Sequence, residues 1–305
     1  MLVLGEVLWD VFDDTKRLGG APLNFAAHAR RLGHEVLLVS ALGDDALGRE
    51  AIQLINGLDL SGAFLQCNPT LKTGTARVHL GPGDRTTLVI DRPAAYDGVR
   101  LTDKDLESLA RLQPEWFYYG TLFPSAAGGK EVLERLLQAL RETTKFYDLN
   151  LRPGFCAPEL VSELLGWADV VKLNEDELQS VHEFTGLPLD IEAFCRDGTK
   201  RYAWSAACVT LGARGCAVFA KGHFVEAHAH PVEVADTVGA GDAFAAAFMH
   251  GLSHGWDAGQ IAAFANQLGA LVASRHGAIP EWTLSEVAEP GGRGLRATER
   301  SRSAT

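Results

Sequence analysis

The stretch DTVGAGDAFAAAF, residues 236–248, joins a glycine turn to a helix of small residues and places a carboxylate at each end of the turn. Small residues at 239–241 let backbone N–H groups converge, and a helix start adds partial positive charge, so the turn can hold phosphate oxygens. Asp242 follows at once, where a carboxylate can take the proton of a hydroxyl as a P–O bond forms. Alone, GAGD also fits an aspartate that caps an ordinary helix. The stretch therefore leaves phosphoryl transfer and simple capping both open.

Around this stretch, short aliphatic or aromatic runs alternate with longer helical patterns. LVLGE (2–6) precedes a helical pattern at 22–32, and the same rhythm returns in EWFYYG (115–120) and the segments after it. Alternation of this kind predicts an α/β fold with a central, mostly parallel sheet, helices on both faces, and ligands at the carboxyl ends of the strands.

Three segments depart from this rhythm. After Asp10, and again at 70–97, strand-like runs flank turn residues, which predicts a small β lid with strands from about 9–18 and 70–97. Consecutive short strands at 207–229 predict an antiparallel edge. The polar segment 289–305 is expected to be a disordered tail after a single α/β domain at 1–288.

Composition limits the functional classes. The 305 residues are 47% hydrophobic and carry a net charge of -11, which argues against a general nucleic-acid or anionic-membrane binder. The five cysteines are scattered without metal-ligand or disulfide spacing, as expected in the reducing cytosol. The chain begins with strand-like residues rather than an export signal, and no apolar run approaches the roughly 20 residues of a membrane span. We expect a cytoplasmic protein.

A second motif, GGAPLNFAAHARRLG at 19–33, puts a double glycine and Asn24 before a helix. Adjacent glycines let the backbone approach a polyol, and Asn24 can donate to hydroxyls and accept from them. Together with 236–248, this motif resembles the two signature regions of the ribokinase-like (PfkB) carbohydrate kinase family, and the fructokinase-like members most. The resemblance runs from Val3 to about Pro280. It implies a three-layer ribokinase-like fold with a β lid.

The resemblance also implies roles for the residues of both motifs. Asp242 matches the catalytic base, and Gly239, Ala240 and Gly241 match the hole that holds the transferring phosphoryl group. The sugar-binding positions are Asp10, Gly19, Gly20, Asn24 and Asn150. For Asp10, at the end of GEVLWD, a solvated acid at a strand end is the alternative.

Metal ions are implied by two further matches. NEDE at 174–177 matches an element in which Asn174 and Glu177 orient Mg2+-bound water and phosphate; a charged first helical turn is the competing interpretation. The resemblance also implies a monovalent cation, K+, at Asp236 and Gly277.

The nucleotide site is implied by VTLGARG, 209–215, which matches the segment along the ribose and phosphates of ATP through Thr210, Gly212 and Gly215. Asn266 matches a residue lining the adenine pocket, although a buried hydrogen-bonding asparagine is equally consistent. The sequence contains neither a P-loop nor a GxGxxG opening a βαβ unit, which argues against P-loop and Rossmann proteins.

The acceptor is suggested by DLNLRPG, 148–154, whose D-x-N-x-R pattern resembles fructokinases and ketodeoxygluconate kinases. Arg152 is suited to neutralise phosphate charge during transfer. We therefore predict an ATP-dependent kinase acting on D-fructose at its 6-hydroxyl. Ribose, 2-keto-3-deoxygluconate or a nucleoside as acceptor, and a non-catalytic sugar-binding regulator, are the alternatives. Four basic residues leave a phosphorylated sugar open: Lys16, Arg17, Lys72 and Arg77. Family lids often form homodimers, but the short segment after Asp10 weakens that expectation.

Overall fold

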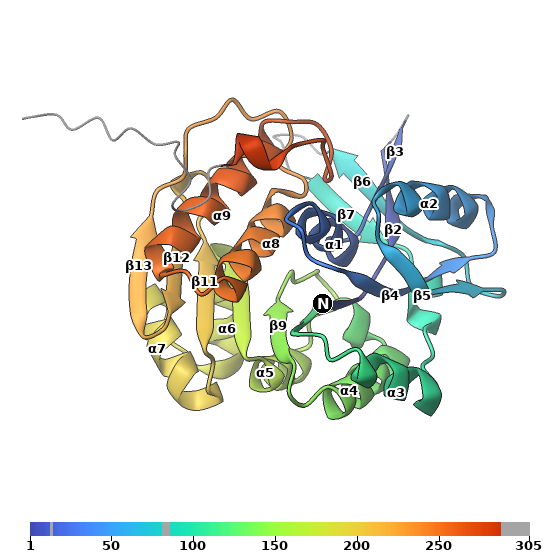
Figure 1. Ribbon diagram of the computed structural model, residues 1–305, viewed down its shortest axis with the longest axis horizontal. Helices are drawn as coiled ribbons and strands as arrows, with labels where there is room; N and C mark the ends of the chain where they lie inside the picture. The colour runs from blue at the N-terminus through green and yellow to red at the C-terminus, as the bar shows by residue number, and fades with distance from the viewer. Residues whose placement is uncertain (13–14, 81–85, 288–305) are drawn as a thin grey trace, which may run out of the picture.

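The computed structural model describes residues 1–12, 15–80 and 86–287, which form a nine-stranded sheet, helices on both of its faces and a separate four-stranded sheet (Figure 1). The large sheet has the order β13-β12-β11-β10-β9-β8-β1-β4-β5. Its strands are β1 (Leu2–Leu4), β4 (Leu37–Gly43), β5 (Ser61–Asn68), β8 (Trp116–Tyr119), β9 (Thr144–Asp148), β10 (Val170–Asn174), β11 (Ala206–Thr210), β12 (Cys216–Ala220) and β13 (His223–Ala227). All neighbours from β5 to β11 pair in parallel, whereas β12 and β13 pair antiparallel. The expected antiparallel edge is confirmed.

Two apolar cores, one on each face of the large sheet, explain why its inner strands are apolar throughout. In β1, Val3 packs into one core, and Leu2 and Leu4 pack into the other. A parallel strand covered on both faces must bury the side chains on both of its sides, so it has no polar alternation. The predicted three-layer α/β fold is confirmed.

Helices from both ends of the described chain cover one face. This layer holds α1 (Ala21–Arg31), α2 (Ala46–Gly57), α8 (Ala240–Ser253) and α9 (Ala258–Ala273). The opposite layer holds α3 (Asp103–Arg111), α4 (Ala127–Ala139), α5 (Pro158–Trp167), α6 (Glu175–Thr185) and α7 (Ile191–Tyr202). The alanine-rich face of α8 lets α1 and α9 pack closely on either side of it (Figure 1).

The predicted lid is the four-stranded sheet, with the order β3-β2-β6-β7. Its strands are β2 (Leu8–Val11), β3 (Lys16–Gly19), β6 (Gly74–Leu80) and β7 (Thr86–Ile90). Trp9 is 2% exposed, and its Nε1 donates to the Leu47 carbonyl of α2 at 3.2 Å, so the lid is fixed to the helical layer beside it.

The chain runs outward from β1 in two directions, first to β4 and β5 and later to β8, β9, β10 and β11. In an open parallel sheet, ligands bind beyond the carboxyl ends of the strands where the order reverses, here between β1 and β8. The assignment of residues 1–288 to one domain stays a prediction, and the expected tail at 289–305 lies outside the described residues. No helix in the described part of the chain is long and apolar enough to cross a bilayer.

Candidate active site

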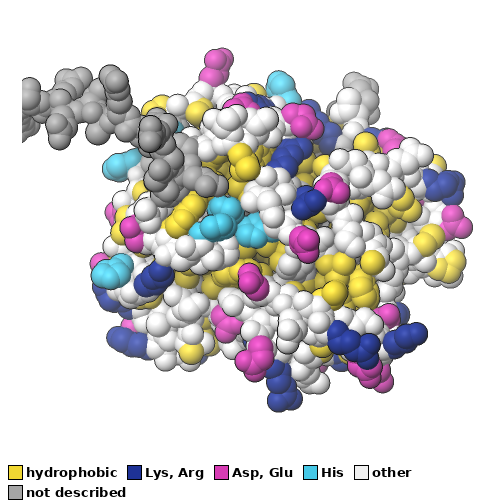
Figure 2. All heavy atoms as spheres, viewed as in Figure 1, with side chains coloured by type: hydrophobic (Ala, Val, Ile, Leu, Met, Phe, Trp, Pro, Cys, Tyr) yellow, Lys and Arg dark blue, Asp and Glu magenta, His cyan; other side chains and the backbone are white. Residues whose placement is uncertain are grey.

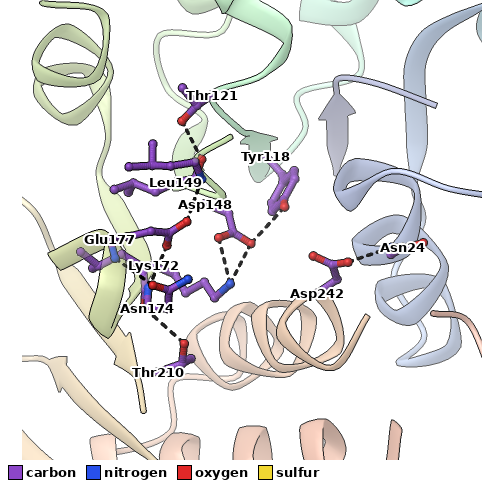
Figure 3. Close-up of polar contacts among 12 residues, drawn as sticks. Asn24, Tyr118, Thr121, Asp148, Leu149, Lys172, Asn174, Glu177, Thr210 and Asp242 are labelled. Carbon is purple, nitrogen blue, oxygen red and sulfur yellow. Dashed lines mark hydrogen bonds and ion pairs between the residues drawn. The ribbon is translucent and has the colours of Figure 1, made fainter. Parts of the chain in front are cut away.

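The carboxyl ends of β8, β9 and β10 meet the N-terminus of α8 and one side of α1, and polar side chains from all of them converge (Figure 3). Asp242, in the first turn of α8, is the central one. It is 9% exposed, and its Oδ2 accepts a hydrogen bond from Nδ2 of Asn24 at 2.8 Å. The two residues are 218 positions apart, and the structure brings together the two motifs singled out in the sequence.

Burial and the negative charge of Asp148 together raise the pKa of Asp242 to about 6, against the opposing effects of Lys172, the Asn24 hydrogen bond and Arg152. A general base works best with a pKa close to the working pH. Asp242 therefore has the burial, the position and the proton affinity of a base that accepts a hydroxyl proton.

The turn before Asp242 needs its glycine. Gly239 has a φ of 81°, and a Cβ there would lie 2.5 Å from Cα of Ala278. The N–H of Ala240 donates to the Thr237 carbonyl at 3.3 Å, but those of Gly239 and Gly241 find no acceptor in the described part of the chain. Two free donors at a helix N-terminus suit an anion, and the expected anion hole at Gly239, Ala240 and Gly241 stays a prediction.

The side chain of Asp10 approaches Asn24 across the double glycine. A Cβ on Gly19 would lie 2.8 Å from Oδ2 of Asp10 and 3.9 Å from Oδ1 of Asn24, and one on Gly20, with a φ of 105°, would lie 2.6 Å from the Glu6 carbonyl. Gly20 is therefore required sterically, whereas a Cβ on Gly19 would displace the Asp10 carboxylate. Burial raises the pKa of Asp10 to about 6, against the attraction of Arg152 and Arg17.

Asn24 supplies the clearest sign of a ligand. It is 4% exposed, and its Oδ1 is buried without a hydrogen-bond partner among the described residues, although its Nδ2 is bound to Asp242. A buried acceptor without a donor is unfavourable by about 1–3 kcal/mol. The geometry thus leaves an acceptor for a ligand hydroxyl beside the base.

Two charged side chains that the sequence analysis did not assign complete this region. Lys172, on β10, donates from Nζ to both carboxylate oxygens of Asp148 at 3.0 and 3.3 Å, and the hydroxyl of Tyr118 donates to the same carboxylate at 3.1 Å (Figure 3). Glu6, the second, follows β1 directly and is 6% exposed; burial raises its pKa to about 7. A lysine inside the apolar run ADVVKLN was the signal available for Lys172.

Arg152 lies among the carboxylates, since its positive charge lowers the pKa of Glu6, Asp10 and Asp242. Its one hydrogen bond among the described residues goes from Nη1 to the Leu151 carbonyl at 3.3 Å, so it forms no ion pair that would keep it from an anion. Asn150 adopts a left-handed φ of 44°, which turns the chain after β9. The expected role of Asn150 on the sugar stays a prediction.

Asn174 and Glu177 form a reciprocal cap at the start of α6. Oδ1 of Asn174 accepts from the Glu177 N–H at 2.8 Å, and Oε2 of Glu177 accepts from the Asn174 N–H at 2.8 Å. Oε1 of Glu177 accepts from the Leu151 N–H at 2.7 Å. This cap matches the competing interpretation, a helix start, and because backbone donors occupy these oxygens the Mg2+ role of the pair, through water, stays a prediction. The described residues contain no group of three or more His, Cys, Asp and Glu arranged to hold a metal.

The expected nucleotide residues also converge. Thr210 ends β11, Gly212 and Gly215 turn the chain with positive φ values of 58° and 108°, and a Cβ on Gly215 would lie 2.6 Å from the Ala229 nitrogen. Nδ2 of Asn266 donates to the carbonyls of Ala227 and His228 at 3.2 and 3.3 Å, which fixes α9 to the segment after β13. This contact matches the structural alternative for Asn266, whose adenine role stays a prediction.

Asp236 and Gly277, the expected K+ position, lie in contact. Oδ2 of Asp236 accepts from the Gly277 N–H at 3.0 Å and from Nη1 of Arg17 at 2.6 Å, and Oδ1 accepts from the Val238 N–H at 3.0 Å. Burial alone would raise the pKa of Asp236, but these hydrogen bonds hold it below its ordinary value. A cation here would displace the Arg17 guanidinium, the one mobile donor of the three.

The other basic residues of the lid lie away from Asp10. Strand register places Lys16, Val11 and Arg77 on one side of the lid, and Asp10 on the other. On the side away from Asp10, Lys16 pairs with Glu50 of α2. Arg77 pairs there with Asp91, and Lys72 is exposed.

Comparison with known proteins agrees with this geometry. The model of the pfkB family carbohydrate kinases matches residues 3–284. Fructokinase-1 of Oryza sativa subsp. japonica is 30% identical over 282 residues, which cover 87% of this chain and 85% of the relative. The aminoimidazole riboside kinase of Salmonella typhimurium is 30% identical over 277 residues, which cover 86% of this chain and 83% of the relative.

Among solved structures, a fructokinase from Vibrio cholerae O395 superimposes with a TM-score of 0.78 at 25% identity, covering 91% of this chain and 94% of that one. That protein was crystallised with fructose, ADP and a calcium ion, and a double mutant of it with fructose, ADP and a potassium ion. Both the family model and the solved fold span the site described above.

Proposed function

The chain belongs to the pfkB family of carbohydrate kinases, and from this premise we propose that it transfers the γ-phosphoryl group of ATP to the 6-hydroxyl of D-fructose. Membership of this family establishes phosphotransfer to an alcohol group as the type of reaction. The choice of acceptor, the roles of individual residues and the use of Mg2+ and K+ are the proposal.

The observation that carries the proposal is Asn24. One end of its amide holds the base Asp242, and its other end is a buried acceptor without a donor among the described residues. Oδ2 of Asp10 lies near the same point, beside Gly19. Two acceptors and a base side by side are complementary to a polyol, whose hydroxyls donate to the acceptors while one of them faces the base.

The reaction uses these groups in order. As the acceptor oxygen bonds to the γ-phosphorus and the bond to ADP breaks, Asp242 takes the hydroxyl proton. The free N–H groups of Gly239 and Gly241 hold the phosphoryl oxygens. Asn174 and Glu177 would hold Mg2+ through water, and the ion would supply positive charge to the phosphates of ATP. Thr210, Gly212, Gly215 and Asn266 are the proposed contacts of the nucleotide.

Charge favours a neutral sugar. The acceptor region contains Glu6 and Asp10, two acidic side chains that would repel a carboxylate or phosphate on the substrate. Arg17, the lid cation on the same side as Asp10, is engaged by Asp236. This distribution supports fructose over 2-keto-3-deoxygluconate or a phosphorylated sugar.

Two finer points extend the proposal. All five cysteines are free thiols, which is consistent with a reducing cytoplasm. The outer strands of the lid, β3 and β7, each pair on one side only, which leaves an edge for a second copy in a lid-mediated homodimer.

The test is ADP release coupled to a redox reporter, with Mg-ATP and equal concentrations of fructose, ribose, 2-keto-3-deoxygluconate, fructose 6-phosphate and aminoimidazole riboside. We expect fructose to exceed every other acceptor at least tenfold in kcat/KM, or about 1.4 kcal/mol. Identity to aminoimidazole riboside kinase makes a riboside the second candidate. If kcat/KM is higher with the riboside than with fructose, the riboside replaces fructose as the acceptor. If none of the five acceptors gives turnover, the result favours a non-catalytic sugar-binding regulator.

A further inference from the structure

Lys172 has a role that capping, sugar contact and nucleotide contact do not explain. Its side chain is 8% exposed and lies at the centre of the polar network, between Glu177 and Asp242 (Figure 3). Asp148, its hydrogen-bonded partner, is completely buried. A buried ion pair of this kind is weak evidence for stability, because an apolar pair of similar volume often stabilises a fold as much or more.

The ammonium is charged despite its burial. Both carboxylate oxygens of Asp148 accept hydrogen bonds from Nζ, and the carboxylates of Glu177 and Asp242 lie on either side of it (Figure 3). The ammonium of Lys172 thus has more carboxylates around it than the single one that would neutralise its charge. Lys172 is therefore a fixed positive charge in the part of the site that contains the base.

The position of Nζ points to the anion hole. A Cβ on Gly241 would lie 3.6 Å from Nζ of Lys172, so the ammonium lies directly beside the turn at the start of α8. Within the described chain, both hydrogen bonds of Nζ go to Asp148, which leaves at least one of its three N–H donors for a ligand. The free N–H of Gly241 is at the same place.

We propose that Lys172 is a catalytic residue that donates a hydrogen bond to the phosphoryl group during transfer, and that Asp148 is the positioning residue that holds it. The proposal rests on the proposed function of the site. The acceptor oxygen bonds to phosphorus, the bond from phosphorus to ADP breaks, and the hydroxyl proton goes to Asp242. Lys172 keeps its proton and stabilises the charge on the phosphoryl oxygens. Arg152, in the loop that follows β9, supplies a second positive charge near Asp242.

The experiment compares kcat, the KM for fructose and the Kd for Mg-ADP in Lys172→Met, Lys172→Arg and the double variant Asp148→Asn/Lys172→Met. Loss of one preorganised donor lowers kcat by about 10²- to 10³-fold. We expect that loss in Lys172→Met with KM and Kd within about threefold of the parent, and partial rescue by Lys172→Arg. Lys145→Met is the matched control. Lys145 also pairs with an aspartate, Asp169, which directly precedes β10 and lies at the amino ends of the strands, away from the site.

The double variant separates catalysis from structure, because it removes both buried charges at once. If Lys172 only neutralised Asp148, the double variant would recover kcat together with stability to urea. Recovery of more than a third of parental kcat overturns the proposal, and a folded double variant that stays about 10²-fold slow supports it.

A second measurement keeps the two proposals distinguishable. A parent protein that is silent with every acceptor refutes the proposed function. Calorimetric binding of Mg-ADP with and without fluoroaluminate, a mimic of the phosphoryl group, then still tests Lys172. The affinity of the parent for Mg-ADP should increase when fluoroaluminate is present. Lys172→Met should bind Mg-ADP as the parent does but without this increase. Equal gain in both proteins overturns the role of Lys172.

Discussion

Asp242→Asn is expected to stop turnover and, at the same time, to stabilise the folded protein at neutral pH. Asp242 is 9% exposed, and among the described residues its carboxylate has one side-chain hydrogen-bond donor, Asn24. Burial raises its pKa from 3.8 to about 6. One pKa unit corresponds to about 1.4 kcal/mol, so holding the charge in the folded state is unfavourable by about 3 kcal/mol. Asparagine has the same shape and no charge.

The sign of the pH dependence follows from the raised pKa. The folded state binds the proton of Asp242 more tightly than the unfolded state does, so this stabilisation is complete below about pH 4 and is lost as the pH rises through about 6. In urea unfolding at pH 8, the free energy of unfolding of Asp242→Asn should exceed that of the parent by up to about 3 kcal/mol. At pH 5 the difference in free energy should be clearly smaller. Asp103→Asn, at a residue that is 94% exposed, is the control and should change neither value.

Activity should move in the opposite direction. Loss of a general base lowers kcat by about 10²- to 10⁴-fold, or about 3–5 kcal/mol in the barrier. In the parent, kcat/KM should fall about tenfold per unit below pH 6, because the base is then protonated. Coupled ADP release measures both effects. A variant that keeps more than a tenth of parental kcat, or that is less stable than the parent at pH 8, would refute the reasoning.

Three further substitutions test the neighbouring parts of the site. Gly239→Ala forces a Cβ into a left-handed turn against backbone and should lose about 1–3 kcal/mol in urea unfolding together with turnover. Asn24→Leu removes the free acceptor and should raise the KM for fructose about 5- to 150-fold, the equivalent of the about 1–3 kcal/mol of a buried hydrogen bond. Arg17→Met removes the guanidinium that occupies Asp236, so turnover in K+ should increase relative to turnover in tetramethylammonium. Arg77→Met, on the side of the lid away from Asp10, is the control and should leave this ratio unchanged.

The parts of the site that sequence predicts well are those in which function is local. Gly239 and Asp242 are adjacent, so the turn, the helix start and the carboxylate are visible in one short stretch. Asn24 follows a double glycine for a similar reason. Their meeting across 218 positions came from the family resemblance, because no periodicity connects the two motifs.

The missed residues acquire their roles from topology. Lys172 and Glu6 are ordinary charged residues in strand-like runs until the parallel order of the sheet places both strand ends at one edge. Lys16 and Arg17 are neighbours in sequence, and only strand register decides that Arg17 shares the side of Asp10. For Glu177, a helix cap and a residue that binds Mg2+ through water require the same residue type, so the sequence alone does not choose between the two roles.

Because α1 and α8 are far apart in the sequence but pack in one layer, a delay separates their synthesis on the ribosome. Asn24, on α1, leaves the ribosome 218 residues before Asp242. At 5–20 residues per second, that interval is about 10–45 s. During it, the sheet face that α8 and α9 will cover is without them, so its apolar side chains are open to chaperones. The growing chain thus contains Asn24, the proposed sugar contact, well before it contains Asp242, the proposed base.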